Sequence, residues 1–196
     1  MSGTVTPLLV SGESLDVQFE HRHAEVNPER VLAMLRLKTA ILLRFAAEAG
    51  IAIGLKIDDF THSTVQSAGR FAESAGLAFQ IQDDVLGLFG DEEQLKKPVG
   101  SDVRAGKPTL LYLAALERAT DEDAQFLRST LGDPALSADG IERVRTIVRG
   151  SGALEQVRSL AARHLQTARE MLAGFPESAA RERLERWTAQ LLTRQS

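Results

Sequence analysis

The sequence predicts an all-α fold in a single domain spanning residues 1–196. Apolar residues recur at helical spacing along most of the chain, and no stretch alternates apolar and polar residues as a half-buried strand would. There is no internal repeat, and no shift in composition marks a domain boundary. A chain of 196 residues is long enough to bury one sizeable core.

Composition and charge exclude several classes of function. Hydrophobic residues make up 43% and charged residues 26% of the chain, which is ordinary for a soluble globular protein. The net charge of −4 argues against broad nucleic-acid binding. The lack of cysteine excludes disulfides and thiolate metal sites. No stretch has the pattern of a signal peptide or the length of a membrane span, so a cytoplasmic location is expected.

The first strongly patterned helix is predicted from Asn27 to about Gly54. Asn27 suits the N-cap and Pro28 the first helical position, because the missing proline N–H needs no partner there. Gly54 is expected to end the helix, since glycine readily takes the left-handed conformation found at helix C-termini. One stripe of this helix is predicted to consist of Val31, Leu35, Lys38 and Leu42, extended by Leu32, Ile41, Phe45 and Ala49.

The second helix is predicted over Thr64–Phe89. Its first half is rich in small residues, which allow another helix to approach closely: Ala68, Gly69, Ala72, Ala75 and Gly76. The segment 90–108 is predicted as one long polar loop, because it holds three glycines, two prolines and the basic residues Lys96, Lys97, Arg104 and Lys107.

The C-terminal half is predicted to form further helices. Thr109 and Thr120 are expected to cap helices that run to Ala119 and to about Leu131. An amphipathic helix is predicted over 153–175, and Pro176 is expected to start the last one. The last helix is predicted to pack onto the body through Leu184, Trp187, Leu191 and Leu192.

Asp83 and Asp84 stand in an apolar stretch of the second predicted helix, where two adjacent charges are costly unless something offsets them. Gln80, one turn earlier, and Gly87, one turn later, share their helical face. A carboxylate pair with an amide makes a small cluster of hard oxygen ligands, which suits Mg²⁺. The alternative is an ordinary solvated or salt-bridged pair of surface aspartates.

Basic residues after this helix suggest a polyphosphate ligand. Lys97 and Lys107 lie in the polar loop, where Gly100 and Gly106 let the backbone approach a ligand closely. Lysines beside a metal-binding carboxylate pair suit polyphosphate, because metal and ammonium groups then share the neutralisation of its charge.

The pair Lys38–Thr39 is a third candidate element. Lys38 falls on the apolar side of the first helix, where a charged tip is costly unless it leaves the apolar surface. Two alternatives are open: the ammonium group reaches a binding site, or it extends to water.

Four stretches of the chain combine these features in a fixed order. FQIQDDVLGLFGD and KKPVGSDVRAGKPTL resemble the second aspartate-rich region and the following lysine loop of the trans-type polyprenyl diphosphate synthases, the farnesyl, geranylgeranyl and longer-chain enzymes. LRLKTAILLRFAAEAG resembles the family's Lys-Thr helix, and SGESLDVQFE resembles its Gly-Gln-x-Leu-Asp-Leu segment. The resemblance is collinear over essentially the whole chain, and the combination of motifs is specific.

The resemblance implies an antiparallel helical bundle of the isoprenoid synthase type and a Mg²⁺-dependent prenyltransferase of isoprenoid biosynthesis. The family joins an allylic diphosphate to isopentenyl diphosphate, releases pyrophosphate, and is usually homodimeric through a region that includes Leu15–Phe19. It implies catalytic roles for Lys38, Thr39, Gln80 and Lys97, substrate contacts by these four with Phe79 and Lys107, and Mg²⁺ binding by Asp83 and Asp84.

The chain departs from the family pattern in three ways. Gly87 replaces the third aspartate of the second motif. Glu13 replaces a usual glutamine, where its charge either repels a diphosphate or faces a helix partner. The family's first aspartate-rich motif has no counterpart: Asp58–Asp59 lacks the arginine pair that follows that motif and is interpreted as an acidic pair at a helix start.

Three hypotheses therefore stay open. The chain is the C-terminal portion of a prenyl synthase whose front half lies elsewhere, a non-catalytic subunit that modulates a full-length synthase, or a helical module that binds isoprenoid diphosphate without turnover. A homodimer or a heteromer with a full-length synthase is expected. Without the front helices, an apolar wall is expected to face water or a partner, formed by Leu35, Leu42, Phe45, Phe79 and Leu86.

Overall fold

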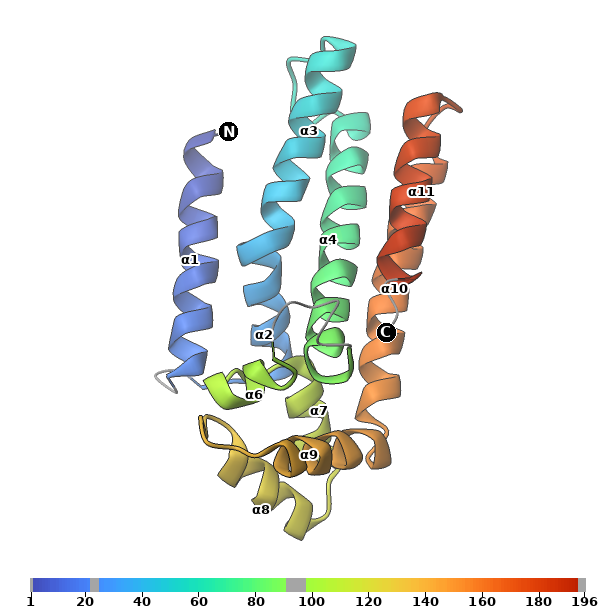
Figure 1. Ribbon diagram of the computed structural model, residues 1–196. Coiled ribbons are helices and arrows are strands. Elements are labelled where there is room, and N and C mark those ends of the chain that lie inside the picture. Colours follow the sequence, from blue (N-terminus) through green and yellow to red (C-terminus); the bar gives the residue numbers. More distant parts are fainter. Residues whose placement is uncertain (1, 22–24, 91–97, 194–196) are drawn as a thin grey trace. The chain divides into compact units, whose positions relative to one another are not determined.

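The computed structural model describes residues 2–21, 25–90 and 98–193, and every regular element in these ranges is a helix (Figure 1). The prediction of an all-α fold is confirmed. The helices in chain order are α1 (Ser2–Glu20), α2 (Pro28–Leu35), the π-helical η1 (Arg36–Ala40), α3 (Ile41–Leu55), α4 (Ser63–Phe89), α6 (Ser101–Ala105), α7 (Leu110–Arg118), α8 (Asp121–Thr130), α9 (Ala138–Gly150), α10 (Ala153–Ala173) and α11 (Ala179–Thr193).

The chain divides into two compact units. The first comprises Met1–Glu13, Met34–Gln80 and Ala161–Arg194, and the second comprises Ser14–Ala33 and Ile81–Leu160. Several helices, α4 among them, contribute residues to both units. Each candidate site residue is therefore assigned to the unit whose residue range contains it.

The core of the first unit forms where small residues of α4 meet α3, α10 and α11, which run beside it (Figure 1). A Cβ atom added at Gly76 would lie 2.9 Å from Leu43 Cδ1 and 3.2 Å from Ala40 Cα, so glycine is required for this approach. The predicted use of small residues for close packing is confirmed. Buried together in this core are Phe71, Ala72, Ala75, Ala78, Leu165, Ala168, Leu172 and Leu191.

The second unit has its own core, built chiefly by α7, α8 and α9. Leu111, Leu127, Val144 and Val148 are among its fully buried side chains. The amphipathic pattern of α9 places Ile141, Val144, Ile147 and Val148 on one side at the 3.6-residue period, which explains why this helix is stable against its neighbours.

The predicted helix caps at Asn27, Thr109 and Thr120 are confirmed. The Arg30 N–H donates to Asn27 Oδ1 at 2.9 Å, at the start of α2. The Thr109 hydroxyl accepts from the Tyr112 N–H at 3.3 Å, and the Thr120 hydroxyl from the Asp123 N–H at 3.3 Å. Each cap satisfies a backbone donor that has no partner within its helix.

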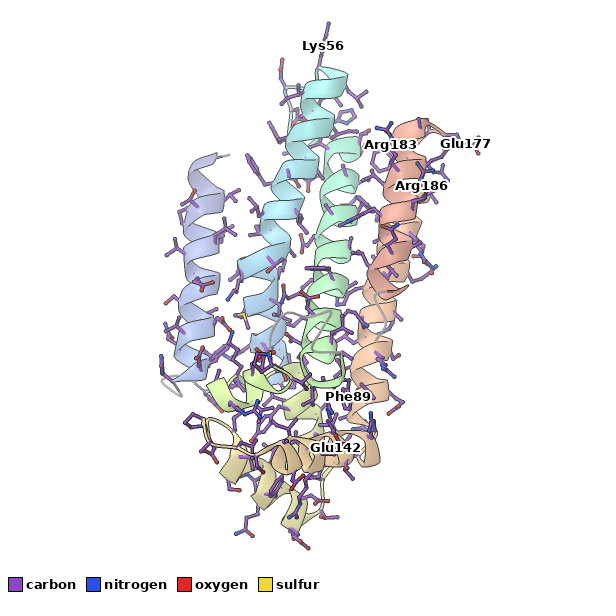
Figure 2. The ribbon with its side chains drawn as sticks, viewed as in Figure 1. Lys56, Phe89, Glu142, Glu177, Arg183 and Arg186 are labelled. Atoms are coloured by element: carbon purple, nitrogen blue, oxygen red, sulfur yellow. The ribbon has the colours of Figure 1, made fainter. Side chains whose placement is uncertain are left out.

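The predicted end of α3 near Gly54 is confirmed to within one residue, but glycine is not the residue that takes the left-handed conformation there. The helix continues past Gly54 to Leu55, and Lys56 takes the left-handed conformation at φ 55° and ψ 44° (Lys56 is labelled in Figure 2). The Lys56 N–H donates to the Ile53 carbonyl and the Ile57 N–H to the Ala52 carbonyl. These turn hydrogen bonds satisfy the last carbonyls of α3, which outweighs the steric cost of a side chain at positive φ.

Four further elements differ from prediction. The polar loop 90–108 contains a short helix, α6, between Gly100 and Gly106, which both have positive φ. The last helix begins at Ala179 and not at Pro176, because the Ser178 hydroxyl caps it by accepting from the Arg181 N–H at 3.2 Å. Two helices, α1 and α9, were not predicted, since glycine, proline and turn-forming residues interrupt their patterns.

The prediction for the packing of α11 is confirmed at only one position. Leu191 is buried, but Leu184 and Trp187 are 39% and 38% exposed, and the side chain of Leu192 lies outside the described residues. Thr188, for which no packing was predicted, is fully buried. Its burial is tolerated because its hydroxyl donates to the Leu184 carbonyl at 2.6 Å, which leaves no polar atom unsatisfied.

Replacing Lys56 by glycine is expected to raise the free energy of unfolding by about 0.5–1 kcal/mol, because the left-handed conformation then carries no Cβ penalty. Urea unfolding measures the change. Lys56→Ala is the matched control, since it removes the same side chain but keeps the penalty, and should not stabilise. Equal stabilisation by both variants would contradict the conformational explanation.

Candidate functional site

The pair Lys38–Thr39 lies in the π-helical turn between α2 and α3. The Ile41 N–H donates to the Arg36 carbonyl five residues earlier, so this turn holds one residue more than an α-helical turn. The extra residue changes which side chains face the core: Val31 and Leu35 are buried, but Leu42 is 49% exposed. The predicted continuous stripe through Leu42 is therefore wrong. Of the predicted apolar wall facing water, the exposure of Leu42 is confirmed and that of Leu35 is wrong.

Two glycines let neighbouring helices approach this turn. A Cβ atom at Gly12 of α1 would lie 2.4 Å from the Lys38 backbone nitrogen and 2.7 Å from the Leu37 carbonyl carbon. Gly76 of α4 makes the corresponding close approach to Ala40 on another side of the turn. Backbone atoms cannot move aside as a flexible side chain can, so these positions exclude larger residues.

The ammonium group of Lys38 contacts Glu13 of α1. Lys38 Nζ lies 3.1 Å from Glu13 Oε2, and the two side chains are 33% and 60% exposed. Lys38 combines the two alternatives. Its ammonium group extends to a partly solvated ion pair, and its aliphatic stem lines a cavity. Glu13 faces this lysine on a neighbouring helix.

Thr39 points to a different neighbour. Its hydroxyl donates to Gln80 Oε1 of α4 at 3.2 Å. Consecutive residues of the π-helical turn thus reach two helices, Lys38 toward α1 and Thr39 toward α4. The bond fixes the Gln80 carbonyl oxygen and leaves its amide N–H groups available as donors.

A cavity of about 430 Å³ lies beside this pair in the first unit. Its walls are mostly apolar, with Lys38 and Thr39 supplying the polar edge. A cavity of this size and character suits a ligand with an apolar body and an anionic end group. It is lined by Lys38, Thr39, Leu42, Leu43, Phe79, Trp187, Gln190 and Leu191.

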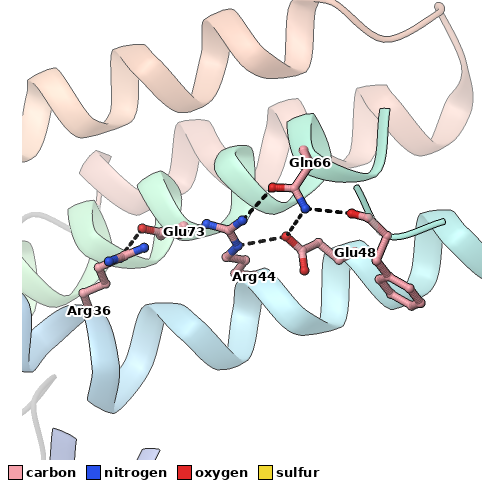
Figure 3. A network of polar contacts seen from close by, with 6 residues as sticks. Arg36, Arg44, Glu48, Gln66 and Glu73 are labelled. Atoms are coloured by element: carbon pink, nitrogen blue, oxygen red, sulfur yellow. Dashed lines mark hydrogen bonds and ion pairs between the residues drawn. The ribbon is translucent and has the colours of Figure 1, made fainter. Parts of the chain in front are cut away.

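A polar network anchors the π-helical turn and α3 to α4 (Figure 3). Arg36 pairs with Glu73, and Arg44 Nη1 lies 2.8 Å from the second oxygen of Glu73. Arg44 also donates to Gln66 and to Glu48, both at 2.8 Å, and Glu48 is only 3% exposed. A buried carboxylate with these partners is held in one position, because breaking the contacts leaves its charge unsatisfied.

Burial alone would raise the pKa of Glu73, but the hydrogen bonds from Arg36 and Arg44 outweigh it and lower the pKa. Burial likewise opposes the charge of Arg44, while hydrogen bonds to Glu73 and Glu48 raise its pKa. Both groups are therefore charged around neutral pH. The sequence offered one signal for this network: arginine and glutamate four residues apart at Arg44 and Glu48, within an otherwise apolar helix.

The aspartate pair belongs to the second unit. Asp83 and Asp84 lie half-buried on α4, and Asp84 lines a small pocket with Gly87, Asp102 and Lys107. The Gly100 N–H donates to the Gly87 carbonyl at 3.0 Å. Gly87, which stands in place of the third aspartate of the motif, thus holds the backbone just before α6 through its carbonyl group.

Lys107 follows Gly106, the left-handed C-cap of α6. Its N–H donates to the Asp102 carbonyl at 2.9 Å, and its ammonium group lies 3.9 Å from Asp16 Oδ2. The predicted partner in the polar loop, Lys97, lies outside the described residues. The second unit therefore places Asp84 and Lys107 at one pocket, while Lys38, Thr39, Phe79 and Gln80 lie together in the first unit.

The carboxylates of the candidate site form an incomplete set of metal ligands on their own. Within residues 2–21, 25–90 and 98–193, no group of three or more histidine, cysteine, aspartate or glutamate side chains could hold an ion. Asp83 and Asp84 supply two adjacent carboxylates, which fits Mg²⁺ only where water and ligand phosphates complete the coordination.

Among the described residues, none of the helices combines the length and the hydrophobicity that a membrane span requires.

The interpretation of Asp58–Asp59 as a helix-start pair is corrected. Asp59 accepts from the Thr61 N–H at 2.8 Å and from its hydroxyl at 2.7 Å, and α4 begins only at Ser63. These two hydrogen bonds from Thr61 hold the pKa of Asp59 below its usual range. Asp59 thus closes the turn before the helix.

Comparison with known proteins gives a consistent result. The family model for polyprenyl synthetase matches residues 2–148. A short chain isoprenyl diphosphate synthase of Methanothermobacter thermautotrophicus is 39% identical over 178 residues, which cover 90% of this chain and 52% of that protein. A geranylgeranyl diphosphate synthase of Saccharolobus solfataricus is 34% identical over 175 residues, 89% of this chain and 51% of the relative.

Solved structures give the same picture. Geranylgeranyl pyrophosphate synthetase from Pyrococcus horikoshii superposes with a TM-score of 0.85 at 29% identity, covering 97% of this chain and 56% of that one. The polyprenyl synthase from Caulobacter crescentus complexed with calcium and isoprenyl diphosphate also gives 0.85, at 31% identity, covering 99% and 58%. The chain spans about half the length of the curated relatives it matches.

Replacing Arg44 by methionine is expected to lower the free energy of unfolding by about 3 kcal/mol, because Glu48 then keeps a buried charge without its main partner. Urea unfolding measures the loss, and Arg44→Met with Glu48→Met should recover most of it. Arg186→Met removes an exposed pair with Glu182 and should cost under about 0.5 kcal/mol. Equal losses in Arg44→Met and Arg186→Met would contradict the buried network.

Proposed function

This chain belongs to the polyprenyl synthetase family, and we propose that it supplies the allylic-diphosphate part of a prenyltransferase site. The observation that carries the proposal is the π-helical turn, which sets Lys38 and Thr39 at the polar edge of a mostly apolar cavity. An allylic diphosphate needs this combination, since its two ends are chemically opposite. The relatives named above are isoprenyl diphosphate synthases, which supports the same substrate class.

The reaction we propose transfers the allylic group to isopentenyl diphosphate. The allylic C–O bond breaks and its electron pair leaves with pyrophosphate, then a new C–C bond forms and a proton is lost. Negative charge grows on the leaving oxygens, so a cation such as Lys38 and a hydroxyl donor such as Thr39 favour bond breaking. The apolar walls around Phe79 and Leu43 exclude water, which would otherwise capture the carbocation.

In this proposal Asp83 and Asp84 would hold Mg²⁺ through their carboxylates. When bound, the metal neutralises charge on the leaving diphosphate. Lys107 contributes positive charge at the Asp84 pocket, and Lys97 is assigned to the same loop by sequence alone. Gln80, held by Thr39, presents its amide N–H groups as donors.

We further propose that residues 1–196 form the C-terminal portion of a polyprenyl synthase fold. The match to about half the length of each relative supports this proposal. In that case the other half of the fold has to come from additional chain or from a partner. A homodimer and a heteromer with a full-length synthase both satisfy it. A purely modulatory subunit has no need for Lys38 and Thr39 at a cavity, which favours substrate binding over that role.

Mg²⁺-dependent binding of farnesyl diphosphate is expected for the purified chain, measured by calorimetry with and without millimolar Mg²⁺. Asp83→Asn should weaken binding about ten-fold, because a metal-bridged phosphate contact is lost. Asp121→Asn, an exposed first-turn aspartate of the second unit, is the matched control and should have no effect. Turnover with isopentenyl diphosphate in the same sample separates catalysis from binding alone. Binding that ignores both Mg²⁺ and Asp83 would contradict the proposal.

Lys38→Gln is expected to weaken binding of the same diphosphate about ten-fold, because a charge-assisted contact is replaced by a neutral one. Lys56→Gln changes an exposed lysine of the same unit and should leave affinity within two-fold. Circular dichroism checks that both variants fold. If the two substitutions had the same effect, Lys38 would not be the diphosphate contact.

A further inference from the structure

The ion pair between Glu13 and Lys38 has no part in the chemistry proposed above. Its atoms are 3.1 Å apart, and it lies at the polar edge of the cavity that Lys38 lines. A carboxylate at this place already occupies the ammonium group that a diphosphate oxygen would contact. The pair therefore sets the charge that an incoming anion meets.

The backbone fixes Glu13 beside this lysine. Its neighbour Gly12 packs so closely that a Cβ atom there would lie 2.4 Å from the Lys38 nitrogen. The Cα of Glu13 is thus held next to the π-helical turn by a contact that involves no flexible side chain. Its carboxylate therefore starts from a backbone position close to Lys38, which favours the ion pair while the side chain stays able to turn away.

We propose that Glu13 is an affinity-determining residue that competes with the diphosphate group for Lys38. This inference rests on the proposed function, because it concerns the same diphosphate site. The Glu13 carboxylate and a diphosphate repel each other when both approach this ammonium group, so binding of the diphosphate favours displacement of the carboxylate.

The displacement costs little, so Glu13 weakens binding without preventing it. The Glu13 side chain is 60% exposed and can turn into water, and ion pairs of this exposure contribute only modestly to stability. Removing the charge of Glu13 is therefore expected to tighten binding by about two- to five-fold.

Calorimetry of inorganic pyrophosphate and farnesyl diphosphate with Mg²⁺ tests the inference on four chains: the unmodified protein, Glu13→Gln, Lys38→Gln and the double variant. Glutamine keeps the size of Glu13 and removes its charge. Glu182→Gln is the matched control, because Glu182 is 68% exposed, belongs to the same unit and pairs with Arg186 away from the cavity lining.

The expected result is a two- to five-fold lower Kd for Glu13→Gln, no change for Glu182→Gln, and loss of the Glu13 effect when Lys38 is also replaced. Tightening that persists in the Lys38→Gln background would overturn the inference, because a general charge effect would then explain it. Binding to the unmodified chain with no tightening in Glu13→Gln would overturn the inference while the proposed function stands. Absence of binding to every variant would instead overturn the proposed function, and the competition with it.

Discussion

The close approach of backbone to the π-helical turn Arg36–Ala40 is the constraint on which the candidate site of the first unit depends. Gly12 and Gly76 carry no side chain at the points where α1 and α4 reach this turn. The turn holds one residue more than an α-helical turn, and its consecutive residues Lys38 and Thr39 reach different helices. A larger residue at either glycine would move the turn and with it both polar groups.

Charge placement follows from the same constraint. The side chains of Arg36, Arg44, Glu48 and Glu73 tie α3 and the turn to α4 through contacts of which several are shielded from water. In a site of low dielectric such contacts are strong when complete and costly when one partner is missing. The network therefore holds the turn in register, and it leaves Lys38 with Glu13 at the cavity edge as a weaker, more exposed pair that a ligand can open.

Much of the helical fold was predictable from the sequence, and the predictions that failed did so for physical reasons. The caps at Asn27, Thr109 and Thr120 are local, so they could be identified from residue type alone. The π-helical turn has no such local signature in the sequence, and the predicted stripe through Leu42 failed because this turn holds one extra residue. Trp187 was predicted to pack onto the body of the protein, but it lines the cavity. The sequence of α11 alone does not show which of its faces meets the core, because that depends on how α11 packs against α10.

Binding of a diphosphate at the π-helical turn can be measured by the protection of Lys38 from a lysine acylating reagent, followed by peptide mass spectrometry with and without farnesyl diphosphate and Mg²⁺. The ligand is expected to slow acylation of Lys38 at least five-fold, while acylation of Lys56, an exposed lysine of the same unit, is unchanged. Equal acylation of Lys38 with and without saturating ligand would show that the diphosphate does not bind at the π-helical turn.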